Sequence, residues 1–395
     1  MIIKEIHAKA IKDSRNIGTI EISVNSCKAS SPSGTSSGKY ETKSYRKSLN
    51  ESIKDINNLK ELRRSEVNDF SDLIKIEEII KKKFKLKKAQ DIGANVLVAL
   101  EFAILKALAK SEKKELWQII NPKLNLNNAK MPFPVGNAIG GGEHSRMFKI
   151  HPVFQEFELI PQRKSIKENV KLMQKAYNEA SRILKTKKAN YEGALQSDID
   201  NETALRVLFE ISKKYKIKIG LDIAASTFYD AKDKLYYYNN KVLDKEAQIN
   251  YIFNIIKDFD LFYIEDPVNE EDFNGFSRIM NSINRNLRTS VLIVGDDLTA
   301  THIGRLKKAV KAKAINALIV KPNQNGSLLE LKEIIDCCKK NRIKTILSHR
   351  SGETLDDSIA DLAFAWQCDF IKFGISTKWR RIKLKRLIEI EKKVK

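Results

Sequence analysis

Cysteine, proline, glycine and long hydrophobic runs are all scarce in this sequence. Four cysteines in 395 residues are too few for a disulfide framework, and two of them, Cys337 and Cys338, are adjacent, which is not the spacing of a zinc knuckle. Eight prolines and 16 glycines exclude collagen-like and low-complexity chains. The longest clean apolar runs, such as residues 96–100, fall far short of the roughly 20 residues of a membrane span, and no signal peptide opens the chain. We expect a soluble cytoplasmic protein without membrane contact.

Acidic residues are also in deficit, because 72 Lys and Arg face 50 Asp and Glu and give a net charge of +22. Such a balance fits a nucleic-acid partner, an anionic substrate or a lysine-rich surface. Residues 378–395 hold nine Lys or Arg and two Glu, a net +7, which leaves +15 spread over the other 377 residues. The diffuse part indicates a surface composition and makes nucleic acid an unexpected partner. Polyanion binding by the basic tail stays open.

The first third of the chain has the pattern of an α+β domain. Residues 2–10 and 19–24 alternate between apolar and polar, which is typical of half-buried strands. Residues 45–115 have helical spacing, with a long apolar helix expected over 95–109. A proline-marked stretch near residue 132 ends this part. We predict an N-terminal α+β domain over 1–125.

The remaining residues, 126–395, repeat short apolar runs that end in polar residues, with helical patterns between several of them. Eight such runs predict the α/β class and a (β/α)8-like barrel, whose chemistry lies at the mouth formed by the carboxyl ends of the strands. The alternative, an open doubly wound sheet, would need a glycine-rich phosphate fingerprint that is missing. The predicted strands are 154–160, 189–193, 217–222, 261–266, 291–297, 317–321, 345–350 and 370–374.

The polar residues at these strand ends form one acidic and one basic group. Three carboxylates on consecutive strands, without cysteine, suit Mg²⁺. A lysine among other cations can act as a base near neutral pH, and an arginine beside a serine suits a phosphate or carboxylate. The residues are Glu156, Glu192, Asp222, Glu265, Asp296, Lys321, His349, Arg350 and Lys372.

Longer motifs around these positions show that the sequence resembles the enolase family over almost its whole length. The most specific are Gly295-Asp296-Asp297-Leu298-Thr299 and the run from Ser348 to Thr354. The others are Asp13-Ser14-Arg15, the Pro32–Gly38 loop, Gly93-Ala94-Asn95, Asn137 to His144, Gln155-Glu156-Phe157, Leu221 to Ser226, Ile264 to Pro267 and Lys321 to Gln324.

The resemblance implies an enzyme that reversibly dehydrates 2-phosphoglycerate to phosphoenolpyruvate with two Mg²⁺ ions. It makes Lys321 the base at C2 and Glu192 the acid at the C3 hydroxyl, with Glu156 in support and His349 beside them. It further implies a homodimer or higher even oligomer. The implied substrate-binding residues are His144, Gln155, Arg350, Ser351 and Lys372. The implied metal ligands are Asp222, Glu265, Asp296 and, for the second ion, Ser36.

Two segments depart from the usual family pattern. The family usually has Asp before the acid and two Gly after it, where this chain has Tyr191-Glu192-Gly193-Ala194, and the usual Thr-Gly-Ala-Pro after Lys372 is Phe373-Gly374-Ile375-Ser376. Two alternatives therefore stay open. One is a diverged enolase-like enzyme for another 2-hydroxy acid. The other is a binding protein for polyanions that keeps only the scaffold.

Overall fold

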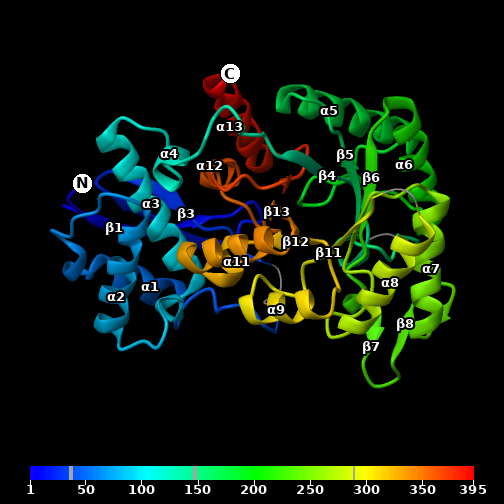
Figure 1. Cartoon of the computed structure of the whole chain (residues 1–395), viewed down its shortest axis with the longest axis horizontal. Helices are drawn as coiled ribbons and strands as arrows, with labels where there is room; N and C mark the ends of the chain where they lie inside the picture. The colour runs from blue at the N-terminus through cyan, green and yellow to red at the C-terminus, as the bar shows by residue number, and fades with distance from the viewer. Residues whose placement is uncertain (35–38, 146–148, 288–289) are drawn as a thin grey trace.

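An antiparallel sheet covered by helices forms the N-terminal part of the molecule (Figure 1). The structure is a computed structural model that describes residues 1–34, 39–145, 149–287 and 290–395, without the side chains of 143 and 144. The sheet order is β1-β2-β3. Its strands are β1 (Ile6–Lys12), β2 (Gly18–Val24) and β3 (Cys27–Ser30), and its helices are α1 (Leu49–Asn57), α2 (Leu73–Phe84), α3 (Ala94–Glu112) and α4 (Leu116–Ile120).

Helix α3 is the core element of this part because it packs across β2 and β3. Its sequence is apolar on almost every face, and 15 of its 19 residues are buried, which is the pattern of a helix enclosed on all sides. The helix expected over 95–109 is thus confirmed. Within the stretch 45–115 that was predicted to be helical, the structure has the separate helices α1, α2 and α3.

The rest of the chain forms a closed eight-stranded barrel, as predicted. Its strands are β4 (Phe133–Gly140), β5 (Glu156–Ile160), β6 (Lys218–Asp222), β10 (Tyr263–Glu265), β11 (Leu292–Gly295), β12 (Ala317–Val320), β13 (Lys344–Ser348) and β14 (Phe370–Lys372). The longer helices of this part are α5 (Ile166–Ile183), α6 (Asn201–Tyr215), α7 (Lys245–Asp258), α8 (Phe273–Asn286), α9 (Ile303–Lys311), α11 (Leu328–Lys340), α12 (Ser358–Ala365) and α13 (Lys378–Val394).

One of the expected barrel strands was wrong, and one strand of the barrel was missed. The barrel starts with β4, which the proline-marked stretch concealed, and the predicted strand 189–193 is a loop. In that loop the Asn190 amide donates to the Ala194 carbonyl at 2.9 Å, so the chain turns back on itself instead of pairing in the sheet. Glu192 therefore lies on a loop, not at a strand end.

One strand runs in the opposite direction to the others. Strand β5 is antiparallel to both of its neighbours, β4 and β6, whereas the other pairs are parallel. Glu156 thus reaches the mouth from the start of β5, not from its end, and pairs in register with Asp222 at the end of β6.

Apolar side chains from seven of the barrel strands form a cluster separate from the main core. The cluster includes Val135, Ile160 and Tyr263, all at most 1% exposed. Strand β10 shows the change from apolar to polar along a strand, since Tyr263 belongs to this cluster and Glu265 faces the polar mouth. Among the described helices, none is long and apolar enough to cross a membrane.

Candidate active site

The strand ends and the loops after them line one pocket of about 900 Å³, including the open space at its mouth. Of the predicted site residues whose side chains are described, only Glu265 is absent from the lining, and it touches the pocket through Lys372. The lining includes the predicted residues Gln155, Glu156, Glu192, Asp222, Asp296, Lys321, His349, Arg350, Ser351 and Lys372. Residues from strands far apart in the sequence therefore share one site.

Lys372 lies at the centre of the carboxylates. Its Nζ is 2.8 Å from Glu265 Oε2, 3.0 Å from Asp222 Oδ2 and 2.9 Å from Glu156 Oε2. Burial opposes the charge of Lys372, but these carboxylates raise its pKa well above the ordinary value. Burial likewise opposes the charge of Glu156, while the Lys372 ammonium brings the pKa of that carboxyl well below its usual range. Burial raises the pKa of Asp222 and, more strongly, of Glu265, so the ionised centre of this part of the pocket is the Lys372–Glu156 pair.

Lys321, the predicted base, forms an ion pair with Asp296. Burial and the Arg350 guanidinium favour the neutral amine, but the Asp296 carboxylate outweighs them and raises the pKa of Lys321. Arg350 thus acts on the pKa of Lys321 as expected of a neighbouring cation, but the carboxylate dominates in the arrangement described here. A base role needs Asp296 to be engaged by another cation.

The carboxylates fit a divalent cation. Two predicted ligands each have one buried oxygen, Glu265 Oε1 and Asp296 Oδ1, that accepts no hydrogen bond from the described residues. Such an orphaned acceptor is costly unless a ligand completes it. Within the described chain, Asp266, Asp296 and Asp297 also bring oxygens within 4.8 Å of one another. Hard carboxylate oxygens of this kind suit Mg²⁺.

Asp266 was not predicted as a site residue, yet it shapes the acidic side of the pocket. It accepts the backbone amides of Asp296 at 3.1 Å and of Asp297 at 2.7 Å, and so fixes the turn after β11. Its own backbone has φ of 42°, in the left-handed region that a non-glycine residue adopts only under constraint. The positive φ was not visible in the sequence.

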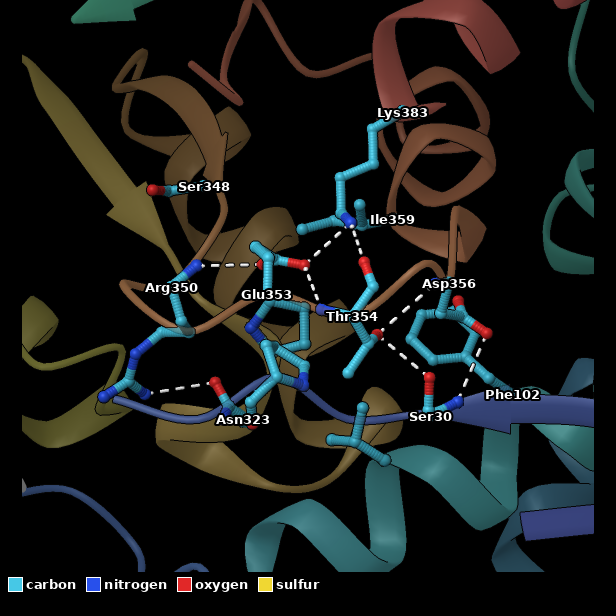
Figure 2. Close-up of a pocket in the computed structure, with 13 residues that line it drawn as sticks. Ser30, Phe102, Asn323, Ser348, Arg350, Glu353, Thr354, Asp356, Ile359 and Lys383 are labelled. Carbon is cyan, nitrogen blue, oxygen red and sulfur yellow. Dashed lines mark hydrogen bonds and ion pairs between the residues drawn. The ribbon is translucent and has the colours of Figure 1, made fainter. Parts of the chain in front are cut away.

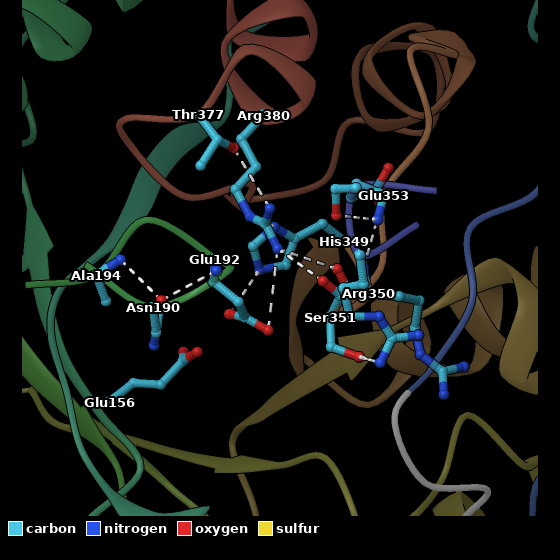
Figure 3. A network of polar contacts seen from close by, with 12 residues as sticks. Glu156, Asn190, Glu192, Ala194, His349, Arg350, Ser351, Glu353, Thr377 and Arg380 are labelled. Carbon is cyan, nitrogen blue, oxygen red and sulfur yellow. Dashed lines mark hydrogen bonds and ion pairs between the residues drawn. The ribbon is translucent and has the colours of Figure 1, made fainter. Parts of the chain in front are cut away.

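Loop 190–194 holds Glu192 against His349 (Figure 3). Asn190 Oδ1 accepts the amides of Glu192 and Ala194, both at 3.0 Å, which organises the loop locally. His349 Nε2 is 4.0 Å from Glu192 Oε2. Burial and the Arg380 guanidinium lower the pKa of His349 well below its ordinary value, so the imidazole is neutral.

The basic side of the pocket is held by residues from both the N-terminal domain and the barrel. Arg350 donates to Glu41 at 2.8 Å and to Asn323 at 3.1 Å, the latter seen in Figure 2. Arg15 donates to Ser351 Oγ at 3.3 Å. Sequence reasoning missed Glu41, which follows a serine-rich loop and has no motif of its own. Both domains therefore build the predicted phosphate site.

Gly352 allows this close approach. A Cβ there would lie 2.0 Å from Asp13 Oδ2 and 2.7 Å from Arg15 Nε, so only glycine fits without movement. Gly352 also bridges to Ser33, and its amide donates to the Ser33 carbonyl at 2.9 Å. Motifs near residues 13, 33 and 352 thus meet at one place.

Three predicted site residues, Ser36, His144 and Gln155, take no part in the contacts described so far. Ser36 lies outside the described residues, and so does the side chain of His144, whose backbone belongs to the short helix Gly142–Ser145. Gln155 donates to Asp222 Oδ2 at 3.5 Å, at the rim of the carboxylate cluster.

The two segments that depart from the family pattern contact each other. The Ser376 hydroxyl donates to the Gly193 carbonyl at 2.8 Å, and Tyr177 donates to the same oxygen at 2.8 Å. Gly193 has φ of 87°, and a Cβ there would lie 2.1 Å from Ser376 Oγ. Loop 190–194 and the segment 373–376 are therefore packed as one unit.

Comparison with known proteins agrees with the geometry. Residues 3–120 match the family model "Enolase, N-terminal domain", and residues 128–395 match "Enolase, C-terminal TIM barrel domain". A protein named enolase from Methanosphaera stadtmanae is 32% identical, with 100% of this chain and 97% of that protein covered. Enolases of Methanocorpusculum labreanum, 33% identical with 98% of both chains covered, and Mycoplasma genitalium, 32% identical with 98% and 92% covered, are similar. With both family models and full-length relatives matched, the chain belongs to the enolase family.

Proposed function

We propose that the pocket catalyses the reversible dehydration of 2-phosphoglycerate to phosphoenolpyruvate. The chain is a lyase of the enolase family, and the observation that supports this reaction best is the single pocket that joins Lys321, Glu192 and Lys372 to a cluster of carboxylates. Arg350 and Ser351 bind the phosphate, and Lys372 binds the carboxylate. The substrate is a phosphorylated 2-hydroxy acid.

The reaction removes a proton and a hydroxide from adjacent carbons. Lys321 Nζ takes the C2 proton, the electron pair forms the C2–C3 double bond, and the C3 hydroxyl leaves as water with a proton from Glu192. Glu156 supports Glu192, and the neutral His349 faces the Glu192 carboxyl. Acid and base come from different elements, a loop and the end of β12, so that each reaches the substrate from its own side.

The difficult part is the charge that develops when a carboxylate loses its α-proton. Asp222, Glu265 and Asp296 would hold Mg²⁺, and Ser36 would reach a second ion. Bound Mg²⁺ supplies electrostatic stabilisation of the substrate's carboxylate oxygens. A cation held by Asp296 would weaken the ion pair of that carboxylate with Lys321. Burial and Arg350 then favour the neutral amine that a base needs.

The test is turnover of 2-phosphoglycerate in the presence of Mg²⁺, followed by the absorbance of phosphoenolpyruvate. Lys321→Ala should abolish both product formation and exchange of the C2 proton with solvent, while circular dichroism stays unchanged. Lys311→Ala, an exposed lysine on α9, is the matched control and should keep full activity. Wild-type protein that binds Mg²⁺ without turnover would favour an enzyme for another 2-hydroxy acid.

We also propose a division between domains at residues 125 and 126, a cytoplasmic location and a homodimer or higher even oligomer. The division is supported by the change from the β1–β3 sheet to the barrel, which starts at Phe133. Light scattering coupled to size exclusion measures the oligomer directly.

A further inference from the structure

The basic C-terminal helix contributes two buried cations to the interior. In α13 the buried positions are Arg380, Lys383, Leu384, Leu387, Ile390 and Glu391, and this spacing of three and four residues marks one helix face. Arg380 is 0% exposed. Its guanidinium points toward Glu192 and His349 (Figure 3). Part of the tail that reads as a solvated basic stretch is thus structural.

Arg380 holds the backbone and side chain of the segment that follows β13. Its Nε donates to His349 Nδ1 at 3.1 Å, and its Nη2 donates to the carbonyls of Ser351 at 3.1 Å and Arg350 at 3.4 Å. The same Nη2 is 3.9 Å from Glu192 Oε1. One planar guanidinium therefore contacts the proposed acid Glu192, the imidazole of His349, and the backbone of residues 350–351, which are proposed to bind the phosphate.

The chain makes room for this side chain. Gly374 has φ of 74°, and a Cβ at that position would lie 2.5 Å from Arg380 Cδ. Thr377 Oγ1 accepts from Arg380 Nη1 at 3.4 Å, at the residue that precedes the first turn of α13. The space between α13 and His349 thus accommodates the side chain of Arg380 because position 374 has no Cβ.

The hydrogen bond to Nδ1 decides where the proton of His349 lies. A neutral imidazole carries one proton, and the nitrogen that accepts a hydrogen bond cannot hold it. An Nδ1 that accepts from Arg380 leaves the proton on Nε2, the nitrogen that faces Glu192. Burial and the charge of Arg380 keep the pKa of His349 low, which agrees with a neutral ring.

We propose that Arg380 is a positioning residue for the acid half of the dehydration, because it fixes His349 as the Nε2–H tautomer and holds the Glu192 carboxyl in place. The proposal rests on the function proposed above. Within the described chain, no contact joins Arg380 to Lys321 or Asp296, so we expect proton removal at C2 to depend on Arg380 much less than elimination does. Arg380 therefore separates the two halves of the reaction.

The test compares two rates in one experiment with 2-phosphoglycerate deuterated at C2. Loss of deuterium to solvent reports the base, and phosphoenolpyruvate formation reports the acid. General acid catalysis is worth about 10²–10⁴-fold, so Arg380→Met should slow elimination about 100-fold while isotope exchange changes less than about twofold. Arg381→Met, at the next and exposed position of α13, is the control and should change neither rate.

Arg380→Lys is a second variant for the case in which Arg380→Met does not fold. It keeps a buried positive charge but lacks the Nε donor to His349. It should fold and still slow elimination more than exchange. Equal loss of both rates, or no loss, in a folded variant would overturn the proposal. A wild type that makes no phosphoenolpyruvate would instead overturn the function.

A direct measurement on the unmodified protein completes the test. The ¹⁵N shifts of the His349 ring, assigned by comparison with His349→Asn, should show an unprotonated Nδ1 and a protonated Nε2 in the wild type. A proton on Nδ1 would contradict the proposal without any arginine variant. In Arg380→Lys the ring should no longer be confined to the Nε2–H tautomer, and an unchanged spectrum would argue against positioning.

Discussion

A buried ion pair between α13 and the segment 350–354 gives a prediction whose size can be worked out (Figure 2). Lys383 Nζ is 2.7 Å from Glu353 Oε2, and the two side chains are each 2% exposed. Lys383 also donates to the carbonyls of Thr354 and Trp379, both at 2.9 Å. Glu353 accepts the amides of Arg350 at 3.0 Å and Thr354 at 3.2 Å. The pair thus ties α13 to the segment that carries Arg350.

Lys383→Met removes one partner and leaves the Glu353 carboxylate buried. Breaking a buried pair in this way costs about 3–5 kcal/mol of unfolding free energy. Because Glu353 keeps two backbone donors, we expect the lower end, about 3 kcal/mol. The double variant Lys383→Met/Glu353→Gln removes both charges and keeps an acceptor for the amides. We expect it to lose only about 1 kcal/mol, less than the single variant.

The assay is urea unfolding of the wild type, both single variants and the double variant, since urea does not screen charge as guanidinium does. Lys385→Met is the matched control. The Lys385 side chain is 77% exposed, and its ion pair with Glu389 is long, at 3.9 Å, and lies at the surface. The control should change the unfolding free energy by less than about 0.5 kcal/mol. Additive losses in the double variant would refute the reasoning, because the two side chains would then not act as a pair.

Four further predictions concern the contact between the domains, the metal, the buried carboxyl of Glu101 and the C-terminal tail. Gly352→Ala should lower stability by about 2 kcal/mol and raise KM for 2-phosphoglycerate, measured by urea unfolding and steady-state kinetics, because its Cβ would meet Asp13. EDTA should abolish turnover, and Asp296→Ala should raise the Mg²⁺ concentration for half-maximal activity about tenfold or more. Burial raises the pKa of Glu101 well above its ordinary value, so the folded state keeps a proton that the unfolded chain loses. Unfolding free energy should therefore fall as pH rises above about 4.3, and Glu101→Gln should flatten that pH profile. Residues 378–395 should give only weak RNA binding that vanishes by about 150 mM salt in fluorescence anisotropy, since several of their cations already pair with carboxylates.

The sequence predicted those parts of the site in which a strand and its closing residue are contiguous. Asp222, Glu265 and Lys372 end strands β6, β10 and β14, and short apolar runs before them made the strands visible. Strand β4 was missed because Pro132 and Pro134, judged only by their sequence neighbours, indicate a boundary between domains and not the start of a strand. Loop 190–194 was misread because its turn depends on a side chain, Asn190, and not on apolar alternation.

The contacts of Arg380 and Glu41 could not be predicted from nearby residues. Glu41 reaches Arg350 across 309 positions, and Arg380 reaches Glu192 across 188 positions. A signal did exist for Arg380, since it occupies the same helical face as Leu384 and Leu387. A basic residue on the apolar face of a helix indicates a buried cation. The high charge of the whole tail made this residue look like one of many exposed cations.

The contact between Gly193 and Ser376 bears on how this chain diverged from its relatives. Both segments differ from the usual pattern, and the space above Gly193 is filled by the Ser376 hydroxyl. A change in either segment alone alters what the other tolerates, so each segment constrains the residues that the other can carry. Segments 190–194 and 373–376 taken from another enolase should fail separately and work when exchanged together.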